Sequence, residues 1–351
     1  MNILEKIAEV VRKGDFTLGD AVDQCETLFA ERVGASYAIG VGSGTDALFL
    51  SLKMLGVGPG DEVITTPFTF YATIGAIVTA GAKPVFVDIK DDYNIDENQL
   101  EAVITKKTKA IVPVHWAGRP CNLDDIREIA DKHQLYIVQD ACHAIEAKYK
   151  DQTPVTFGDV ACYSLHPLKN LNVWGDGGFV TTMDAELAHK MSLLRNHGLR
   201  DRDTCEVFAY NSRLDTLQAV VAIHLMENQL DNTTSSRIKH AHCLDELLKG
   251  IKEVKCLPRD PAIKEVFHLY QINCERRDEL LAYLNSQGID AKIHYPVPMH
   301  LQPAAAEWNY KKGDFPNAER VADTTLSLPV HEYISKDDLN SMVEQVRRFY
   351  S

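Results

Sequence analysis

The sequence predicts an α/β protein: a mainly parallel seven-stranded sheet in a three-layer αβα domain, followed by a smaller α+β domain. Short apolar runs rich in β-branched residues alternate with helical patterns over the first two thirds of the chain. Runs that are apolar throughout, rather than at every second position, are typical of strands in a parallel sheet covered on both faces. Near residue 230 the pattern changes to consecutive helices and then to strands mixed with helices.

The expected elements of the large domain, residues 1–230, follow one another in regular alternation. Strands are expected at 37–41, 62–65, 84–88, 110–114, 136–140, 160–165 and 178–181. Helical periodicity predicts helices at 45–55, 70–80, 96–104 and 123–133. Parallel strands need such crossovers between them, which supports the three-layer arrangement.

A pair of expected helices connects the large domain to the small domain, residues 231–351. These helices are expected at 214–232 and 235–249, joined by the polar run DNTTSS. A strand at 267–274, a helix at 277–287 and a strand at 291–294 come next. A last amphipathic helix is expected from Ser335 to residue 349, because a serine caps a helix start and Asp337 and Asp338 suit its positive end.

Charge and composition exclude several classes of partner. The formal net charge of −13 opposes binding to nucleic acid, whose phosphates it would repel. No apolar run approaches the roughly 18 residues of a membrane span. Eight cysteines are scattered without a CxxC pair, and the chain begins without a signal-peptide pattern, so we expect reduced thiols in the cytoplasm. We expect no metal site.

A glycine-rich turn, YAIGVGSGTDAL, connects the first expected strand to a helix. Gly40, Gly42 and Gly44 allow a tight bend, and the first amides of the helix near Thr45 can bind a phosphate. Thr45 stands where a dinucleotide fingerprint would have its third glycine, so that match is imperfect. A plain strand-to-helix turn remains an open alternative.

Asp140 ends an apolar strand, in the run LYIVQDACHA. Ligands of open α/β sheets bind at the carboxyl ends of the strands, so Asp140 is a candidate metal ligand, general base or counter-ion of a cationic ring nitrogen. His143 follows three residues later, within reach of the same pocket. Gln139 precedes Asp140, and alternation along the strand turns Gln139 to the other side. A structural Asp–His pair is the alternative.

Lys169 lies in a loop, SLHPLKNLNVWGDGG, between two expected strands. A protonated lysine is a poor nucleophile, but burial and a neighbouring positive group lower its pKa. A phosphate-binding turn, a carboxylate at a strand end and a loop lysine are together what pyridoxal phosphate requires. They hold the phosphate, keep the pyridine nitrogen protonated and form the Schiff base.

The chain also resembles the DegT/DnrJ/EryC1/StrS family of sugar aminotransferases over nearly its whole length. The motifs appear in the family's order: VGSGTDAL, TPFTFYATIGAIVTAGAKPVFVDI, TKAIVPVHWAG, QDACHA, SLHPLKNLNVWGDGG, RNHG, YNSRLDTLQA and HYPVPMH. The resemblance implies a fold-type-I pyridoxal 5'-phosphate enzyme. It further implies a homodimer with shared active sites that moves an amino group from glutamate, released as 2-oxoglutarate, to a keto sugar, commonly nucleotide-linked.

The resemblance assigns roles at the reacting end of the cofactor. Lys169 matches the Schiff-base lysine, and Asp140 matches the partner of the ring nitrogen. Phe70 matches the aromatic residue that stacks on the pyridine ring. His143 falls where relatives carry Gln or His, near the phenolic oxygen of the ring. Because some relatives that perform dehydration have His at the lysine position, Lys169 favours transamination.

The resemblance also assigns the phosphate contacts. Gly44, Thr45 and Ser164 match the phosphate cradle, and Asn211 matches a residue that reaches the phosphate from the other subunit. Asp176 replaces the Glu that is common in 4-keto-sugar enzymes, which slightly favours a 3-keto substrate. The chain lacks an initial apolar segment of most relatives, which could alter the dimer or the pocket.

Two other functions remain open at this point. A nicotinamide-dependent oxidoreductase would use the Gly40–Gly44 turn, but it needs an acidic residue closing the next strand. Asp61 and Glu62 instead precede that strand, and Lys169 would have no role. A non-catalytic regulator on the same fold is the second alternative, against which the presence of Lys169, Asp140 and Asn211 argues.

Overall fold

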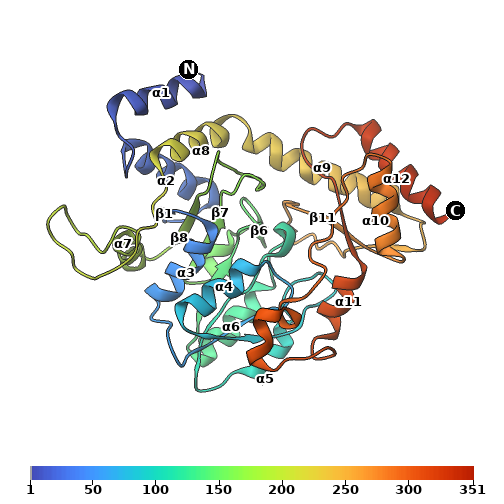
Figure 1. Cartoon of the computed structure of the whole chain (residues 1–351), viewed down its shortest axis with the longest axis horizontal. Helices are drawn as coiled ribbons and strands as arrows, with labels where there is room; N and C mark the ends of the chain where they lie inside the picture. Colours follow the sequence, from blue (N-terminus) through green and yellow to red (C-terminus); the bar gives the residue numbers. More distant parts are fainter. Residues whose placement is uncertain (1) are drawn as a thin grey trace.

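A seven-stranded sheet forms the centre of the large domain in the computed structural model, which describes residues 2–351 (Figure 1). The strand order is β1-β8-β7-β5-β4-β2-β3. Only β8 runs antiparallel to its neighbours, β1 and β7. The expected mainly parallel sheet is therefore confirmed. Its strands are β1 (Tyr37–Val41), β2 (Glu62–Thr65), β3 (Lys83–Phe86), β4 (Thr108–Ile111), β5 (Tyr136–Asp140), β7 (Val160–Ser164) and β8 (Gly178–Thr182).

Helices cover both faces of this sheet, which gives three layers. One apolar cluster joins the strands to α3 (Gly44–Met54), α4 (Tyr71–Ala80) and α7 (Ala185–Leu194). On the other face, α2 (Asp20–Val33) and α8 (Thr216–Asn228) pack at one end, and α6 (Leu123–His133) packs at the other. The N-terminal helix α1 (Ile3–Lys13) lies outside them, against α8.

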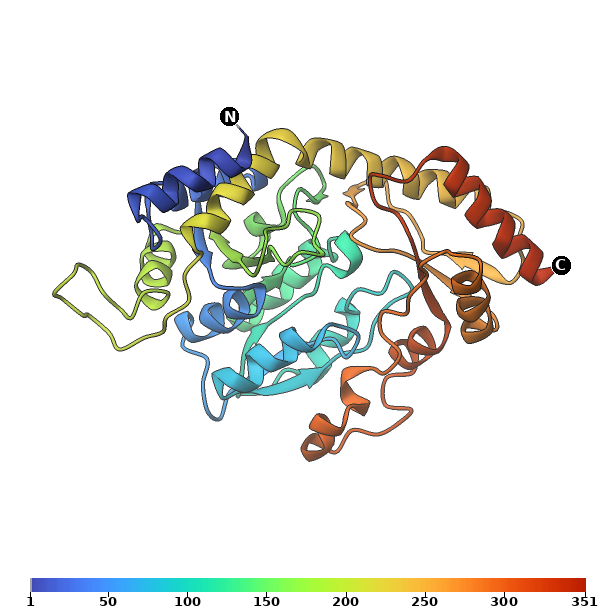
Figure 2. The same ribbon diagram turned by 45° about the horizontal axis from the view of Figure 1, so that its top comes forward.

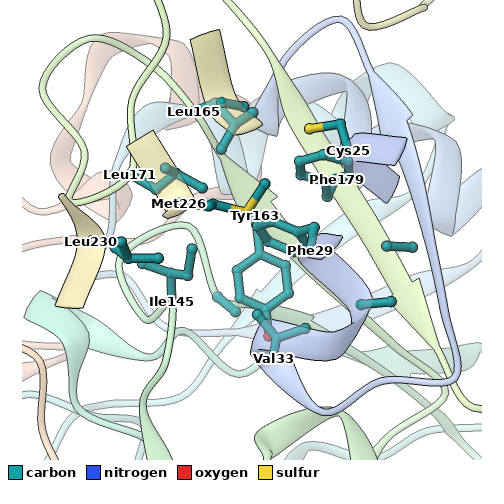
Figure 3. Close-up of a cluster of buried hydrophobic side chains, with 14 of the residues drawn as sticks. Cys25, Phe29, Val33, Ile145, Tyr163, Leu165, Leu171, Phe179, Met226 and Leu230 are labelled. Atoms are coloured by element: carbon teal, nitrogen blue, oxygen red, sulfur yellow. The ribbon is translucent and has the colours of Figure 1, made fainter. Parts of the chain in front are cut away.

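Aromatic packing fixes α2 to the strands on either side of the Lys169 loop. The ring of Phe29 stacks on Phe179 of β8 at 4.0 Å and meets Tyr163 of β7 edge-on at 5.2 Å (Figure 3). Alternate residues of β7 divide between the two faces, with Tyr163 in this cluster and Cys162 in the opposite one. The loop that carries Lys169 therefore leaves from a well-packed pair of strands.

The C-terminal part has a small antiparallel sheet with an apolar core of its own. A long helix, α9 (Leu230–Leu248), leads to it from α8 (Figure 2). The strand order is β12-β11-β9, and the core residues all lie between 238 and 350. The capped last helix is confirmed, because Ser335 and Asp338 form a reciprocal capping box at its start. The elements are β9 (Val254–Cys256), β11 (Tyr270–Cys274), α10 (Arg277–Ser286), α11 (Pro316–Thr324), β12 (Thr325–Leu328) and α12 (Lys336–Tyr350).

Three expectations about local structure were wrong. The polar run DNTTSS belongs to α9, because Thr233 and Thr234 are buried and donate hydrogen bonds to Glu332 and Glu146 over 3.0 and 2.6 Å. The strand at 291–294 is only a single bridge, from Lys292 to Ser327. The helix expected at 96–104 divides into a 3₁₀ turn, Glu97–Gln99, and the short α5, Leu100–Val103.

Two smaller features complete the fold. A two-residue ladder pairs β6 (Lys148–Tyr149) with β10 (Ile263–Lys264), so the two parts of the chain also meet through backbone hydrogen bonds. The division into residues 1–230 and 231–351 stays a prediction. No helix within residues 2–351 is long and apolar enough to cross a membrane.

Candidate active site

A cavity of about 230 Å³ opens at the carboxyl ends of β5 and β7, next to the starts of α3 and α4. Residues of the C-terminal part close it from the other side, among them His268, His294 and Tyr295. All the predicted site residues except Asn211 line this cavity: Gly44, Thr45, Phe70, Asp140, His143, Ser164 and Lys169. Residues far apart in the sequence thus meet where the parallel strands end, as expected for an open α/β sheet.

One end of the cavity is the start of α3. Ser43 caps the helix by accepting a hydrogen bond from the Asp46 amide over 3.0 Å. A Cβ atom on Gly44 would lie 2.6 Å from Cβ of Ser164 and 3.0 Å from Sγ of Cys142, so only glycine fits this close approach. The first amides of a helix have no partner within it. Together with the hydroxyls of Thr45 and Ser164, they form a suitable cradle for a phosphate.

Asp140 is only 6% exposed, and neighbouring groups donate to both of its carboxylate oxygens. Thr73 donates its hydroxyl proton to Oδ2 over 2.7 Å, and the Cys142 amide donates to Oδ1 over 3.2 Å. Gln139 points to the other side, as expected, where its amide donates to the Pro154 carbonyl over 2.6 Å. Asp140 is therefore a buried acceptor that faces the cavity.

Lys169 faces the same cavity from its loop. The loop is held by backbone bonds, from the Lys169 amide to the His166 carbonyl (2.8 Å) and from the Val173 amide to the Leu165 carbonyl (2.9 Å). Burial lowers the pKa of the Lys169 amine below its ordinary value, and the nearby Cys142 and Asp140 oppose this shift. A lowered pKa raises the fraction of neutral, nucleophilic amine.

Two histidine rings that line the cavity pack against each other. The ring centroids of His143 and His268 lie 4.3 Å apart, and Nδ1 of each ring is buried without a partner among residues 2–351. Burial lowers the pKa of both rings well below the ordinary value, and the neighbouring Lys169 lowers both further. Both rings are therefore neutral near pH 7.

His268 was not predicted from the sequence. It comes from the C-terminal part of the chain, in the strand-like run EVFHLYQ, and a single histidine there carries no signal of its own. Thr69 and Thr73 were missed for a similar reason, because hydroxyl residues at a helix start usually indicate capping. Only the tertiary fold brings these side chains to Asp140 and His143.

An exposed aromatic group lies at the mouth of the cavity. Phe70 is 45% exposed although it is surrounded by aromatic neighbours, with its ring 5.8 Å from Tyr295 and 5.4 Å from Tyr71. It sits at the N-cap of α4, which directs it from the helix start toward the cavity. Such a ring can pack against a flat heterocycle.

Asn211 lies elsewhere. It is exposed and forms an isolated bridge with Asn196, outside the cavity of its own chain.

The acidic residues that a nicotinamide site would need also lie outside the cavity. Asp61 accepts the Gly58 amide over 2.9 Å, and Glu62 accepts the Thr105 hydroxyl over 2.6 Å, at the start of β2. Neither Asp61 nor Glu62 therefore lies at the carboxyl end of β2, where the nicotinamide alternative needs a carboxylate for the ribose.

Residues 1–347 match the DegT/DnrJ/EryC1/StrS aminotransferase family. A pleiotropic regulatory protein of Geobacillus stearothermophilus is 43% identical, with 99% of this chain and 94% of the relative covered. The dTDP-3-amino-3,4,6-trideoxy-alpha-D-glucose transaminase of Streptomyces venezuelae is 39% identical, with 98% and 90% covered. The UDP-N-acetyl-3-dehydro-alpha-D-glucosamine 3-aminotransferase of Acidithiobacillus ferrooxidans is also 39% identical, with 99% and 93% covered.

Solved structures agree with this similarity. S. venezuelae DesV in complex with a ketimine intermediate superposes with a TM-score of 0.96 at 38% identity, with 99% of this chain and 94% of that chain covered. NtdA from Bacillus subtilis, solved with bound cofactor PMP, gives a TM-score of 0.93 at 28% identity, with 99% and 81% covered. The chain therefore belongs to the DegT/DnrJ/EryC1/StrS family of pyridoxal-phosphate-dependent sugar aminotransferases.

Proposed function

We propose that this protein transfers the amino group of glutamate to a 3-keto sugar carried on a nucleotide, in amino-sugar biosynthesis. The observation that carries the proposal is the meeting of Lys169, Asp140 and the start of α3 around one cavity. Family membership supplies the reaction class and replaces the nicotinamide alternative. Relatives named for 3-amino and 3-dehydro sugars support the 3-keto position, and Asp176 lines the cavity where it can contact a sugar.

The residues present fit pyridoxal phosphate. The close approach of Gly44 to Ser164 leaves helix amides and hydroxyls for a phosphate, and Phe70 offers its face to a ring. Asp140 would accept a hydrogen bond from the protonated ring nitrogen, and the neutral imidazole of His143 would hold the phenolic oxygen. When bound, pyridoxal phosphate supplies an electron sink and carries the amino group between the two substrates.

Lys169 performs two tasks in this proposal. Its neutral amine would hold the cofactor covalently, and burial favours the neutral form by lowering the pKa of Lys169. The free Nζ atom of Lys169 would then move the proton from Cα of glutamate to the carbon on the other side of the transferred nitrogen. The loop bonds that hold Lys169 in the cavity keep the amine within reach of both positions.

A homodimer completes the proposed site. Asn211 is exposed, and the segment after α7 that precedes it extends away from the body of the molecule (Figures 1 and 2). Phe208 in this segment is 99% exposed, which is unusual for a large apolar side chain and is typical of an interface residue. In the proposed dimer, this segment delivers Asn211 to the phosphate bound by the partner.

A regulatory role is the second candidate, because a relative with 43% identity is named as a pleiotropic regulatory protein. Turnover separates the two functions. A regulator on this fold would bind the cofactor without exchanging amino groups, whereas the transaminase would exchange them. Lys169, Asp140 and the phosphate cradle together favour turnover.

The test is the visible absorbance of the purified protein with pyridoxal phosphate, before and after glutamate. We expect a visible band that bleaches with glutamate and returns with 2-oxoglutarate. Lys169→Ala should lose the covalent band and more than about 100-fold of the amino-transfer rate, since positioned proton transfer contributes at least that factor. Lys312→Ala, an exposed lysine far along the chain, is the matched control.

The outcomes are distinct. A band that glutamate does not bleach would support the regulator, and full activity in Lys169→Ala would remove the proposed mechanism. Product analysis with 3-keto and 4-keto nucleotide sugars then tests the substrate. Faster amination of the 4-keto sugars would contradict the 3-keto assignment.

A further inference from the structure

Two buried hydroxyl groups form a chain of hydrogen bonds to the Asp140 carboxylate, and Thr69, at the start of this chain, also lines the cavity. Thr73 Oγ1 lies 2.7 Å from Asp140 Oδ2, and Thr69 Oγ1 lies 2.7 Å from Thr73 Oγ1. Both threonines are only 1% exposed, so bulk water does not compete for these bonds. The three side chains form an internal network next to the cavity.

The number of protons fixes the direction of this network. A hydroxyl has one proton to donate, and an ionised carboxylate can only accept. Because the Thr73 proton goes to Asp140, the bond between the two threonines must use the proton of Thr69. Donation therefore runs from Thr69 through Thr73 to Asp140, and each bond polarises the next.

The network and the main chain together fix the rotation of the carboxylate. Thr73 holds Oδ2 from the first turn of α4, while the Cys142 amide holds Oδ1 from the segment after β5. Each carboxylate oxygen has about two acceptor positions, so a position remains for an N–H group in the cavity. Because Thr73 and the Cys142 amide hold the two oxygens from different elements, the carboxylate of Asp140 cannot rotate, and its remaining acceptor position keeps one direction.

We propose that Thr73, supported by Thr69, is a positioning residue that orients Asp140 toward the ring nitrogen of the cofactor. This inference rests on the proposed role of Asp140. The start of α4 then performs two tasks, because Phe70 at its N-cap covers the ring while Thr73, three residues later, orients the partner of the ring nitrogen.

Thr73→Val tests this proposal, because it keeps the branched shape and removes only the donor. We expect the rate of the glutamate half-reaction to fall about tenfold, as for a lost hydrogen bond to a charged group, with an unchanged half-saturating glutamate concentration. The dissociation constant for pyridoxal phosphate, measured by titration of the cofactor-free chain, should rise several-fold. Thr73→Ser restores the donor and should stay within about twofold of the original protein.

Thr65→Val is the matched control. Its hydroxyl is also fully buried and donates to the Val112 carbonyl over 2.8 Å, but it lies outside the cavity. We expect its rate and cofactor affinity to match the original protein. If Thr73→Val does not fold, Thr69→Val removes the donor behind Thr73 without touching Asp140, with an expected effect of about threefold.

Asp140→Asn separates failure of this inference from failure of the proposed function. Unchanged rate and affinity in Thr73→Val, together with a strong loss in Asp140→Asn, would overturn the role of Thr73 alone. Unchanged behaviour in both variants would overturn the proposed role of Asp140. A loss in Thr73→Val that Thr73→Ser does not restore would show that packing, not hydrogen bonding, matters at this position.

Discussion

The carboxylate end and the histidine end of the cavity differ in how far the protein itself satisfies their polar groups. At the carboxylate end, Thr73 and the Cys142 amide already donate to both oxygens of Asp140. At the histidine end, His143 and His268 pack against each other with tilted rings, and each keeps a buried Nδ1 atom without a partner among residues 2–351. Asp140, His143 and His268 all line the same cavity.

The difference follows from charge. A buried carboxylate without partners costs far more than a buried neutral imidazole, so the fold must organise Asp140 before any ligand arrives. An unpartnered neutral group costs only about 1–3 kcal/mol. The fold can therefore leave the Nδ1 atoms of His143 and His268 without a partner until a ligand binds. We infer that the fold builds the charged end of the site and that binding completes the neutral end.

The largest expected effect is at the carboxylate end. Asp140→Asn replaces an acceptor by a group with only one oxygen, so the donors Thr73 and Cys142 no longer both find a partner. We expect the glutamate half-reaction to slow about 100-fold, the upper range for a lost charge-assisted hydrogen bond. Stopped-flow absorbance measures the rate, with Asp61→Asn as a control for the substitution itself. A loss below about threefold, within the effect of an ordinary neutral hydrogen bond, would contradict the comparison.

The histidine end should make stability depend on pH. The pKa values of His143 and His268 lie well below the usual value near 6.5, and burial also lowers the pKa of His294, which lines the same cavity, to about 4. Above about pH 6.5 these rings are neutral in both states and contribute nothing. Below that pH the unfolded chain takes up protons that the folded chain refuses, so the free energy of unfolding falls.

Urea unfolding at about pH 7, 6 and 5 measures this dependence, since these values span the usual histidine pKa. Each such histidine can lower the free energy of unfolding by up to about 1.4 kcal/mol per pH unit. His268→Gln should reduce this slope relative to the original protein. Equal slopes in the original protein and in His268→Gln would show that this ring is not kept neutral by burial.

The smallest effect is expected on the stability of the cofactor-free chain when His143 is replaced. His143→Gln keeps a hydrogen-bonding group, and His143→Phe removes an unpartnered polar atom. Both variants should unfold within about 1 kcal/mol of the original protein, because the lost imidazole satisfied nothing in the fold. Differential scanning calorimetry without cofactor measures this change.

Cofactor then distinguishes the two His143 variants. His143→Gln should retain most of the increase in unfolding temperature that pyridoxal phosphate gives, whereas His143→Phe should lose part of this increase. Destabilisation of the cofactor-free Phe variant by several kcal/mol would show that His143 is a structural residue, and the contrast between the two ends would then fail.

The local pattern of apolar runs and turns predicted most strands and helices of the large domain. The strands Tyr37–Val41, Glu62–Thr65 and Tyr136–Asp140 were placed at their observed bounds, because continuous apolar runs between turns have few other solutions. The small domain was predicted less well. Its strand Thr325–Leu328 lies between two helices and pairs with Tyr270–Cys274, a partner far back along the chain that local pattern does not reveal.

The chain by itself determined the family, the cofactor and the residues that point to them. Lys169, Asp140 and the Gly44 turn stand in recognisable motifs, because their chemistry depends on local turns and strand ends. Tertiary structure alone decided which groups surround them. Thr73 meets Asp140 across 67 positions of sequence, and His268 meets His143 from the other part of the chain. Burial turns those encounters into a fixed carboxylate and a neutral imidazole pair, and burial is a property of the packed molecule rather than of any one segment.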